Sequence, residues 1–302
     1  MWFNAPPMAQ RGSGPPLGRL GVWSRQLRYG DLGEARESAA ELEELGYGTL
    51  WLPGMGEDAF DRVDAVLDAT RTVTVATGIV SIWQYEPEAA AARFAALDDR
   101  FGGRFVLGLG VSHAPLVTDA VYERPLRRMA RFLDGLDAAA PPVPVERRMI
   151  AALGPRMLEL TRDRSAGTHP YLVAPAHTRY ARGILGAGPL LAPELTVILE
   201  PDAGAARAAA RRFLGEPYLR FPNYRDSWLR QGFDEADLED GGSDRLVDEV
   251  IAWGGPEAVA ARVGEHLEAG ADHVCLQVLE RDGTRGEHAP RAAWRELAAA
   301  LS

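Results

Sequence analysis

The segment VTVATGIVSI at residues 73–82 carries β-branched or apolar residues at most of its positions. A strand that is apolar on both faces is typical of a parallel sheet covered by helices. Similar short apolar segments recur along the chain, and each is followed by apolar residues at helical spacing. The predicted strands are residues 17–23, 49–52, 73–82, 104–111, 148–152, 171–173, 195–199 and 273–279.

Eight strands that alternate with helices predict an α/β fold, a (β/α)8 TIM barrel with insertions. We expect residues 17–302 to form this single domain, with an irregular segment at residues 214–243. Residues 1–16 contain four prolines and are predicted to be a mobile leader. A doubly wound sheet is the alternative, but the first strand-to-helix turn, WSRQLRYGD, lacks the GxGxxG motif of a dinucleotide-binding fold.

The composition excludes several kinds of chemistry. All 33 basic residues are arginine, so no lysine can form a Schiff base or serve a phosphate-binding P-loop. The single cysteine, Cys275, cannot form an intrachain disulfide, which favours a reducing, cytoplasmic location. The net charge of −10 argues against binding to nucleic acid or to an anionic membrane. The expected partner is therefore a small-molecule substrate.

Active sites of such barrels lie at the carboxyl ends of the strands. His113 is the only histidine at the carboxyl end of a predicted strand, and an imidazole exchanges protons near neutral pH. We therefore predict that His113 is the catalytic acid or base. The structural alternative is a histidine at the barrel rim that is hydrogen-bonded to the backbone.

Aromatic and small residues occupy most other strand ends, which suits a flat ring cofactor. Trp23 and Trp83 are predicted to line the substrate pocket, together with His169 and Tyr171 near the sixth strand. His169 precedes that predicted strand, so it could equally cap or pack. The chain has no HxH or HExxH motif and no paired carboxylates at strand ends, and we predict no metal site and no acid–base hydrolase.

The turn at residues 151–155, AALGP, ends a predicted strand and opens a helix. Free N–H groups at a helix N-terminus attract phosphate, and Arg156 adds positive charge beside them. An ordinary tight turn between strand and helix is the alternative.

Seven stretches together resemble the luciferase-like monooxygenase superfamily, and within it the coenzyme F420-dependent oxidoreductases of actinobacteria. They extend in consistent order over almost the whole chain from Leu17. The stretches are ATGIVSIW (76–83), GRFVLGLGVSHAPLV (103–117), AALGPRMLEL (151–160), HPYLV (169–173), PNYRDSWLRQGF (222–233), SDRLVDEVIAWG (243–254) and AGADHVCLQVL (269–279).

The resemblance implies a deazaflavin or flavin in the barrel mouth. Gly78 and Ile79 match a bulge that backs the ring, often through a non-proline cis peptide. Residues 110–113 match the segment beside the ring, residues 152–154 the phosphate turn and residues 167–168 the contact with the cofactor tail. The implied cofactor-binding residues are Gly78, Ile79, Gly110, Val111, Ser112, Ala152, Leu153, Gly154, Gly167 and Thr168.

The resemblance also implies hydride transfer from coenzyme F420, with His113 handling the proton. The alternatives are an FMN-dependent monooxygenase and a barrel that binds a cofactor without turnover. Related barrels commonly form homodimers, and the stretch at residues 222–233 is predicted to be a lid or a dimer contact, or else a packed loop. The chain departs from the better-known deazaflavin enzymes at residues 53–56 and at Ala166, where acidic residues or histidine are common in those enzymes.

Overall fold

The computed structural model describes residues 14–56, 58–118 and 121–302. The strands are β1 (Leu20–Trp23), β2 (Thr49–Leu52), β3 (Thr74–Thr77), β4 (Val80–Ser81), β5 (Phe105–Gly110), β6 (Arg148–Ile150), β7 (Gly167–Thr168), β8 (Leu190–Leu191), β9 (Glu194–Ile198), β10 (Ile251–Trp253) and β11 (Val274–Leu279).

The α-helices are α1 (Arg25–Tyr29), α2 (Leu32–Glu44), α3 (Ala59–Asp68), α4 (Pro87–Phe101), α5 (Pro125–Ala138), α6 (Pro155–Arg164), α7 (Pro175–Leu185), α8 (Ala203–Gly215), α9 (Pro222–Arg230), α10 (Asp244–Val250), α11 (Pro256–Glu268) and α12 (Arg291–Leu301). Four 3₁₀ turns accompany them, η1 (Ala114–Leu116), η2 (Val145–Arg147), η3 (Tyr218–Arg220) and η4 (Glu235–Leu238). None of the helices in the described ranges is long and apolar enough to cross a membrane.

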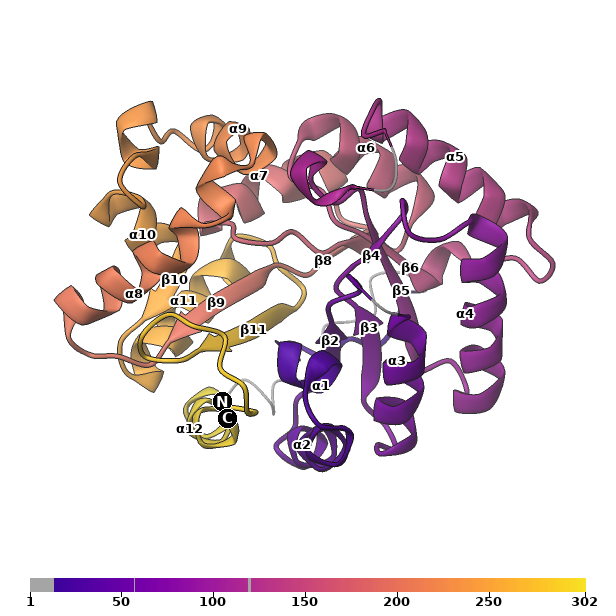
Figure 1. The fold of residues 1–302 in the computed structure, drawn as a ribbon, viewed down its shortest axis with the longest axis horizontal. Coiled ribbons are helices and arrows are strands. Elements are labelled where there is room, and N and C mark those ends of the chain that lie inside the picture. The colour runs from indigo at the N-terminus through magenta and orange to yellow at the C-terminus, as the bar shows by residue number, and fades with distance from the viewer. Residues whose placement is uncertain (1–13, 57, 119–120) are drawn as a thin grey trace.

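The strands form one parallel sheet that curls into a barrel, with helices on its outer side (Figure 1). Its order is β10-β9-β11-β1-β2-β3-β5-β6-β7-β8, and β4 pairs with β5. Only Ala192 and Pro193 separate β8 from β9, and both ends of this segment bond to neighbouring strands. Ala192 N–H donates to the Thr168 carbonyl on one side, and Cys275 N–H donates to the Pro193 carbonyl on the other. The predicted TIM-barrel fold is therefore confirmed.

Alternation along each strand separates the barrel interior from the helix-facing side. Trp51, Ala76 and Cys275 lie in the interior cluster, whereas their strand neighbours Leu50 and Val75 pack with the helices. Large interior side chains fill the lower barrel, so the interior is a packed core. An active site is therefore expected at the carboxyl ends of the strands.

An insertion between β9 and α11 packs on the carboxyl-terminal side of the barrel. It contains α8, α9, α10 and β10, and it has its own apolar core, which includes Phe213, Trp228 and Leu246. Residues 214–243 were expected to be irregular, but they hold α9, because Pro222 starts a helix whose Tyr224 and Trp228 are buried.

The predicted position of the sixth strand requires correction. The sixth strand is Gly167–Thr168 rather than residues 171–173, so His169 and Tyr171 follow the strand instead of flanking its start. The apolar run at residues 171–173 is a buried loop, held by the Trp228 indole N–H, which donates to the Leu172 carbonyl at 3.2 Å. Burial outside the sheet explains its apolar character.

Residues 1–13 of the predicted leader lie outside the described residues, so its mobility stays a prediction. The last residue of that leader, Pro16, lies against the barrel. Its carbonyl accepts a hydrogen bond from the Thr74 hydroxyl at 3.0 Å.

Candidate active site

The mouth of the barrel is a ring of partly exposed residues above fully buried strands. Gly78 and Ile79 follow β3, residues 111–113 follow β5, and Leu153 and Gly154 follow β6, and all of these residues are half-buried. The strands β3, β5 and β6 beneath them are buried along their length. Predicted site residues from three strands therefore share one rim.

The Gly78–Ile79 peptide bond is cis, as the resemblance implied. The Gly78 carbonyl accepts a hydrogen bond from the Trp23 indole at 2.7 Å. A Cβ atom on Gly78 would lie 2.9 Å from Trp23 and 3.3 Å from His169 Nε2. A glycine is thus required here by the close approach of two predicted pocket residues.

A chain of aromatic contacts joins the remaining pocket residues to His113. The ring centroids of Trp23 and Tyr171 are 5.8 Å apart, those of Tyr171 and Tyr224 are 6.5 Å apart, and those of Tyr224 and His113 are 5.2 Å apart. Trp83 lies beside the end of β5, where its indole donates to the Val111 carbonyl at 2.7 Å. Residues scattered from Trp23 to Tyr224 therefore converge at the mouth.

His113 lies at the end of β5 and contacts the insertion. Its Nδ1 is 3.0 Å from Asn223 Oδ1, and its ring stacks on Phe221 at 4.3 Å with an angle of 8° between the planes. Burial lowers the pKa of His113, and the hydrogen bond to Asn223 acts in the opposite direction. A neutral imidazole at neutral pH can accept a proton. The preceding residue, Ser112, has a φ of 56°, which non-glycine residues rarely adopt outside functional or tightly held sites.

The turn after β6 has an uncapped helix N-terminus. No side chain caps α6 at Gly154, and Pro155 occupies its first turn. A Cβ atom on Gly154 would meet only Arg230 Nη2, at 3.8 Å, so open space lies beside this helix end. The free N–H groups and the Arg230 guanidinium together make a suitable environment for a phosphate.

Several predicted residues lie behind the rim rather than on it. Gly110, Ala152, Gly167, Thr168 and His169 are buried. The Thr168 hydroxyl donates to the Ile150 carbonyl at 2.7 Å. A Cβ atom on Gly167 would lie 2.1 Å from the Leu190 carbonyl oxygen, so strand packing alone requires this glycine. The predicted cofactor contacts of Ala152, Gly167 and Thr168 stay predictions.

His169 forms part of the floor of the mouth. Its ring stacks on Trp51 at 3.9 Å, and its Nδ1 lies 2.7 Å from the Ala192 carbonyl, which makes Nδ1 the donor. Its Nε2 is buried and has no hydrogen-bond partner. Burial lowers the pKa of His169 to about 3, so the ring is neutral and Nε2 is a bare acceptor.

A buried polar group occupies the opposite wall, on β9 and β11. Tyr171 donates to Gln277 Oε1 at 2.7 Å and lies 3.1 Å from the Tyr218 hydroxyl, which accepts from Arg285 at 2.7 Å. The Gln277 amide nitrogen is buried without a partner. Glu194 accepts from Leu172 N–H, and burial raises the pKa of Glu194 to about 7.

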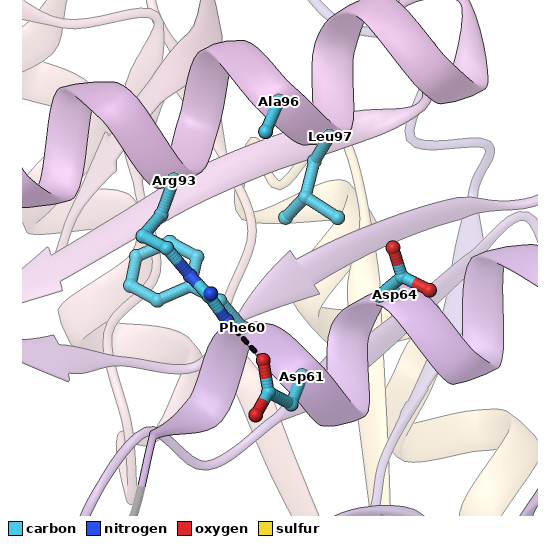
Figure 2. Close-up of a pocket in the computed structure, with 6 residues that line it drawn as sticks. All are labelled: Phe60, Asp61, Asp64, Arg93, Ala96 and Leu97. Carbon is cyan, nitrogen blue, oxygen red and sulfur yellow. Dashed lines mark hydrogen bonds and ion pairs between the residues drawn. The ribbon is translucent and has the colours of Figure 1, made fainter.

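A surface hollow of about 300 Å³ lies away from the mouth. It sits between α3 and α4, on the outer side of the barrel, as Figure 2 shows. Arg93 crosses it to pair with Asp61, and the Arg93 guanidinium lies 5.6 Å from the centre of the Phe60 ring. This ion pair fills a groove between two surface helices and brings no predicted site residue into it. No group of three or more His, Cys, Asp or Glu side chains in the described ranges could hold a metal ion.

The family described as luciferase-like monooxygenase matches residues 16–273. The chain belongs to the luciferase-like monooxygenase family. Two curated luciferase-like relatives match parts of it. The "Putative coenzyme F420-dependent oxidoreductase Rv3520c" of Mycobacterium tuberculosis is 30% identical over 40% of this chain and 35% of its own length. A 4-hydroxyprotoasukamycin monooxygenase of Streptomyces nodosus subsp. asukaensis is 33% identical over 26% of this chain and 23% of its own length. Both alignments span well under two thirds of the relatives.

Solved luciferase-like structures share the fold. An F420-dependent secondary alcohol dehydrogenase has a TM-score of 0.68 at 17% identity and covers 90% of this chain and 98% of its own. The F420-dependent tetrahydromethanopterin reductase of Methanopyrus kandleri has a TM-score of 0.67 at 14% identity, with coverages of 93% and 98%. The oxygenating constituent of 3,6-diketocamphane monooxygenase of Pseudomonas putida, solved with FMN, has a TM-score of 0.64 at 12% identity, with coverages of 94% and 95%. At these identities the likeness shows the fold alone.

Sequence reasoning missed several residues of this luciferase-like mouth. Asn223 was predicted only as part of a lid or dimer contact, and Phe221 directly precedes that segment. The contact of Asn223 with His113 spans 110 positions. Glu194 and Gln277 had a usable signal, because each is a polar residue in an otherwise apolar strand. Such a residue at an inward-facing position predicts a polar group inside the barrel.

Proposed function

We propose that this protein is an F420-dependent oxidoreductase that transfers a hydride between a deazaflavin cofactor and a small organic substrate. The observation that carries the proposal is the half-buried His113 imidazole at the end of β5, whose Nδ1 lies 3.0 Å from Asn223 Oδ1 and whose pKa is lowered by burial. The family membership and the F420 dependence in the name of the mycobacterial relative support the same reading.

The residues of the mouth fit such a cofactor. The open space at Gly154, the uncapped start of α6 and the Arg230 guanidinium suit its phosphate. Gly78, Ile79 and Gly110 are candidates for one side of its ring. When bound, a deazaflavin supplies a ring carbon that gives or accepts a hydride.

His113 performs the accompanying proton transfer. In the oxidative direction its Nε2 takes a proton from the substrate and passes it to solvent. In the reductive direction Nε2 first takes up a proton from solvent and then delivers it to the substrate. Trp23, Trp83 and Tyr171 wall the substrate side and reduce the access of water to the reacting atoms. Because substrate and cofactor are held side by side, proximity contributes much of the rate.

An FMN-dependent monooxygenase is the second candidate. The monooxygenase relative from Streptomyces and the FMN-containing structural neighbour favour it. A barrel that binds its cofactor without turnover is a third candidate.

The proposal further includes a small-molecule substrate, a cytoplasmic location and a homodimer. These parts rest on composition and on the resemblance.

Titration of the purified protein with each cofactor tests the proposal. We expect coenzyme F420 to bind about tenfold or more tightly than FMN, measured by quenching of cofactor fluorescence. Tight binding of FMN without binding of F420 would select the monooxygenase. If neither cofactor binds at micromolar concentration, both redox candidates are wrong.

A further inference from the structure

The insertion contributes directly to the environment of His113. Phe221 precedes α9 and stacks on the imidazole, and Asn223 in the first turn of α9 places Oδ1 at 3.0 Å from Nδ1. Two contacts from one turn fix the ring plane and its rotation at once. They come from a segment more than 100 residues away in sequence.

The chemistry of the contact decides where the imidazole carries its hydrogen. An amide oxygen only accepts hydrogen bonds, so its partner Nδ1 must be the donor. In a neutral ring, Nε2 then has no hydrogen and is an acceptor. The charged and titratable neighbours do not oppose this state. Burial is the main cause that lowers the His113 pKa, and Tyr224, whose ring lies 5.2 Å away, has a pKa well above its ordinary value and stays neutral.

We infer that Asn223 is a positioning residue, which holds His113 in the tautomer with hydrogen on Nδ1 and so presents a bare Nε2 to the barrel mouth. The inference rests on the proposed role of His113 for its functional meaning. The position of the hydrogen on the His113 ring is a property of the protein alone and can be measured without a cofactor. The insertion therefore completes the acid–base group, in addition to covering it.

Side-chain nitrogen NMR of the full chain without cofactor tests this inference. The His113 signals are assigned by their loss in His113→Gln. We expect hydrogen on Nδ1 and none on Nε2 in the wild type at neutral pH. In Asn223→Leu, which removes the accepting oxygen, we expect a mixture of both tautomers.

A charge change supplies the second measurement. Asn223→Asp keeps the acceptor and adds a negative charge beside Nδ1, so the His113 pKa is expected to rise by about 1 unit or more. Asp226→Asn is the control, because it changes the charge of an exposed residue on the same helix, and the His113 titration should stay unchanged.

Three results would overturn the inference: hydrogen on Nε2 in the wild type, an unchanged tautomer in Asn223→Leu, or an unchanged His113 pKa in Asn223→Asp. Failure of the proposed function is a separate outcome. It is seen as the absence of cofactor binding, which leaves the tautomer measurement valid. Conversely, F420 can bind as proposed while Asn223→Leu leaves the tautomer unaltered, and then only the inference is wrong.

Discussion

Replacement of His113 by alanine is expected to lower the rate of F420-linked hydride transfer by about 10²–10⁴-fold, the usual contribution of a positioned general acid or base. The imidazole is the only predicted proton carrier on the rim. In the variant, water must take its place as the proton donor or acceptor for the substrate. Affinity for the cofactor should change little, because His113 is expected to face the substrate. The rate is measured from the absorbance of the oxidised deazaflavin with a panel of small alcohols and activated alkenes.

His288→Ala is the control for this variant, because the His288 side chain is 85% exposed and remote from the mouth in sequence. It should retain full activity. An unchanged turnover of the same substrate by His113→Ala would show that the acid–base assignment is wrong, even if cofactor binding is confirmed.

Mild acid is expected to unfold this protein cooperatively near pH 5. Four histidines, His169, His177, His266 and His273, are buried, and burial lowers their pKa values to about 3, 4, 3 and 4 from the ordinary 6.5. In the unfolded chain these rings take up protons as the pH falls below about 6.5. In the folded state the same rings bind protons only at a much lower pH, because burial lowers their pKa values.

The sign of this effect follows from proton linkage. Between about pH 6.5 and 4.5 the unfolded state binds up to four more protons at these histidines, so the free energy of unfolding falls as the pH falls. Glu194 acts in the opposite direction, since its raised pKa of about 7 makes the folded state bind one proton first. Three net protons correspond to about 4 kcal/mol per pH unit, a large part of the about 5–15 kcal/mol that stabilises a typical protein.

Urea unfolding at about pH 7.5, 6.5 and 5.5 measures the effect. His266→Gln should reduce the pH dependence by about one proton, because burial lowers the pKa of His266 to about 3 and this ring therefore takes up a proton in the unfolded chain first. His288→Gln should not alter the slope. A free energy of unfolding that stays constant across this range would refute the linkage.

The barrel could be predicted because its strands and helices have strong local patterns. Residues 73–82 and 104–111 are apolar on both faces, and parallel strands with helices on their outer side require that pattern. The sixth strand could not be located in this way. Gly167 and Thr168 form only a short strand, while the more apolar residues 171–173 are buried under the insertion. Hydrophobicity reports burial and does not report strand pairing.

The candidate site was predictable where it depends on strand ends. The barrel rule selects His113, and the resemblance selects Gly78, which lies next to Trp23. The contact of Asn223 with His113 and the position of Arg230 beside Gly154 could not be predicted, because they depend on how the insertion folds back over the mouth. No local pattern in the insertion encodes that approach.

The affinity of coenzyme F420 for Gly154→Val tests the central claim most directly, namely that the cofactor lies in this barrel mouth with its phosphate at the start of α6. A Cβ added at Gly154 would meet only Arg230 Nη2, at 3.8 Å, so the valine side chain is expected to extend into the open space beside the helix end. Gly188→Val is the matched control, since nothing lies within 4 Å of a Cβ at that glycine. We predict that Gly154→Val weakens binding by about tenfold or more while Gly188→Val binds as the wild type. Equal affinity of all three proteins would contradict the account.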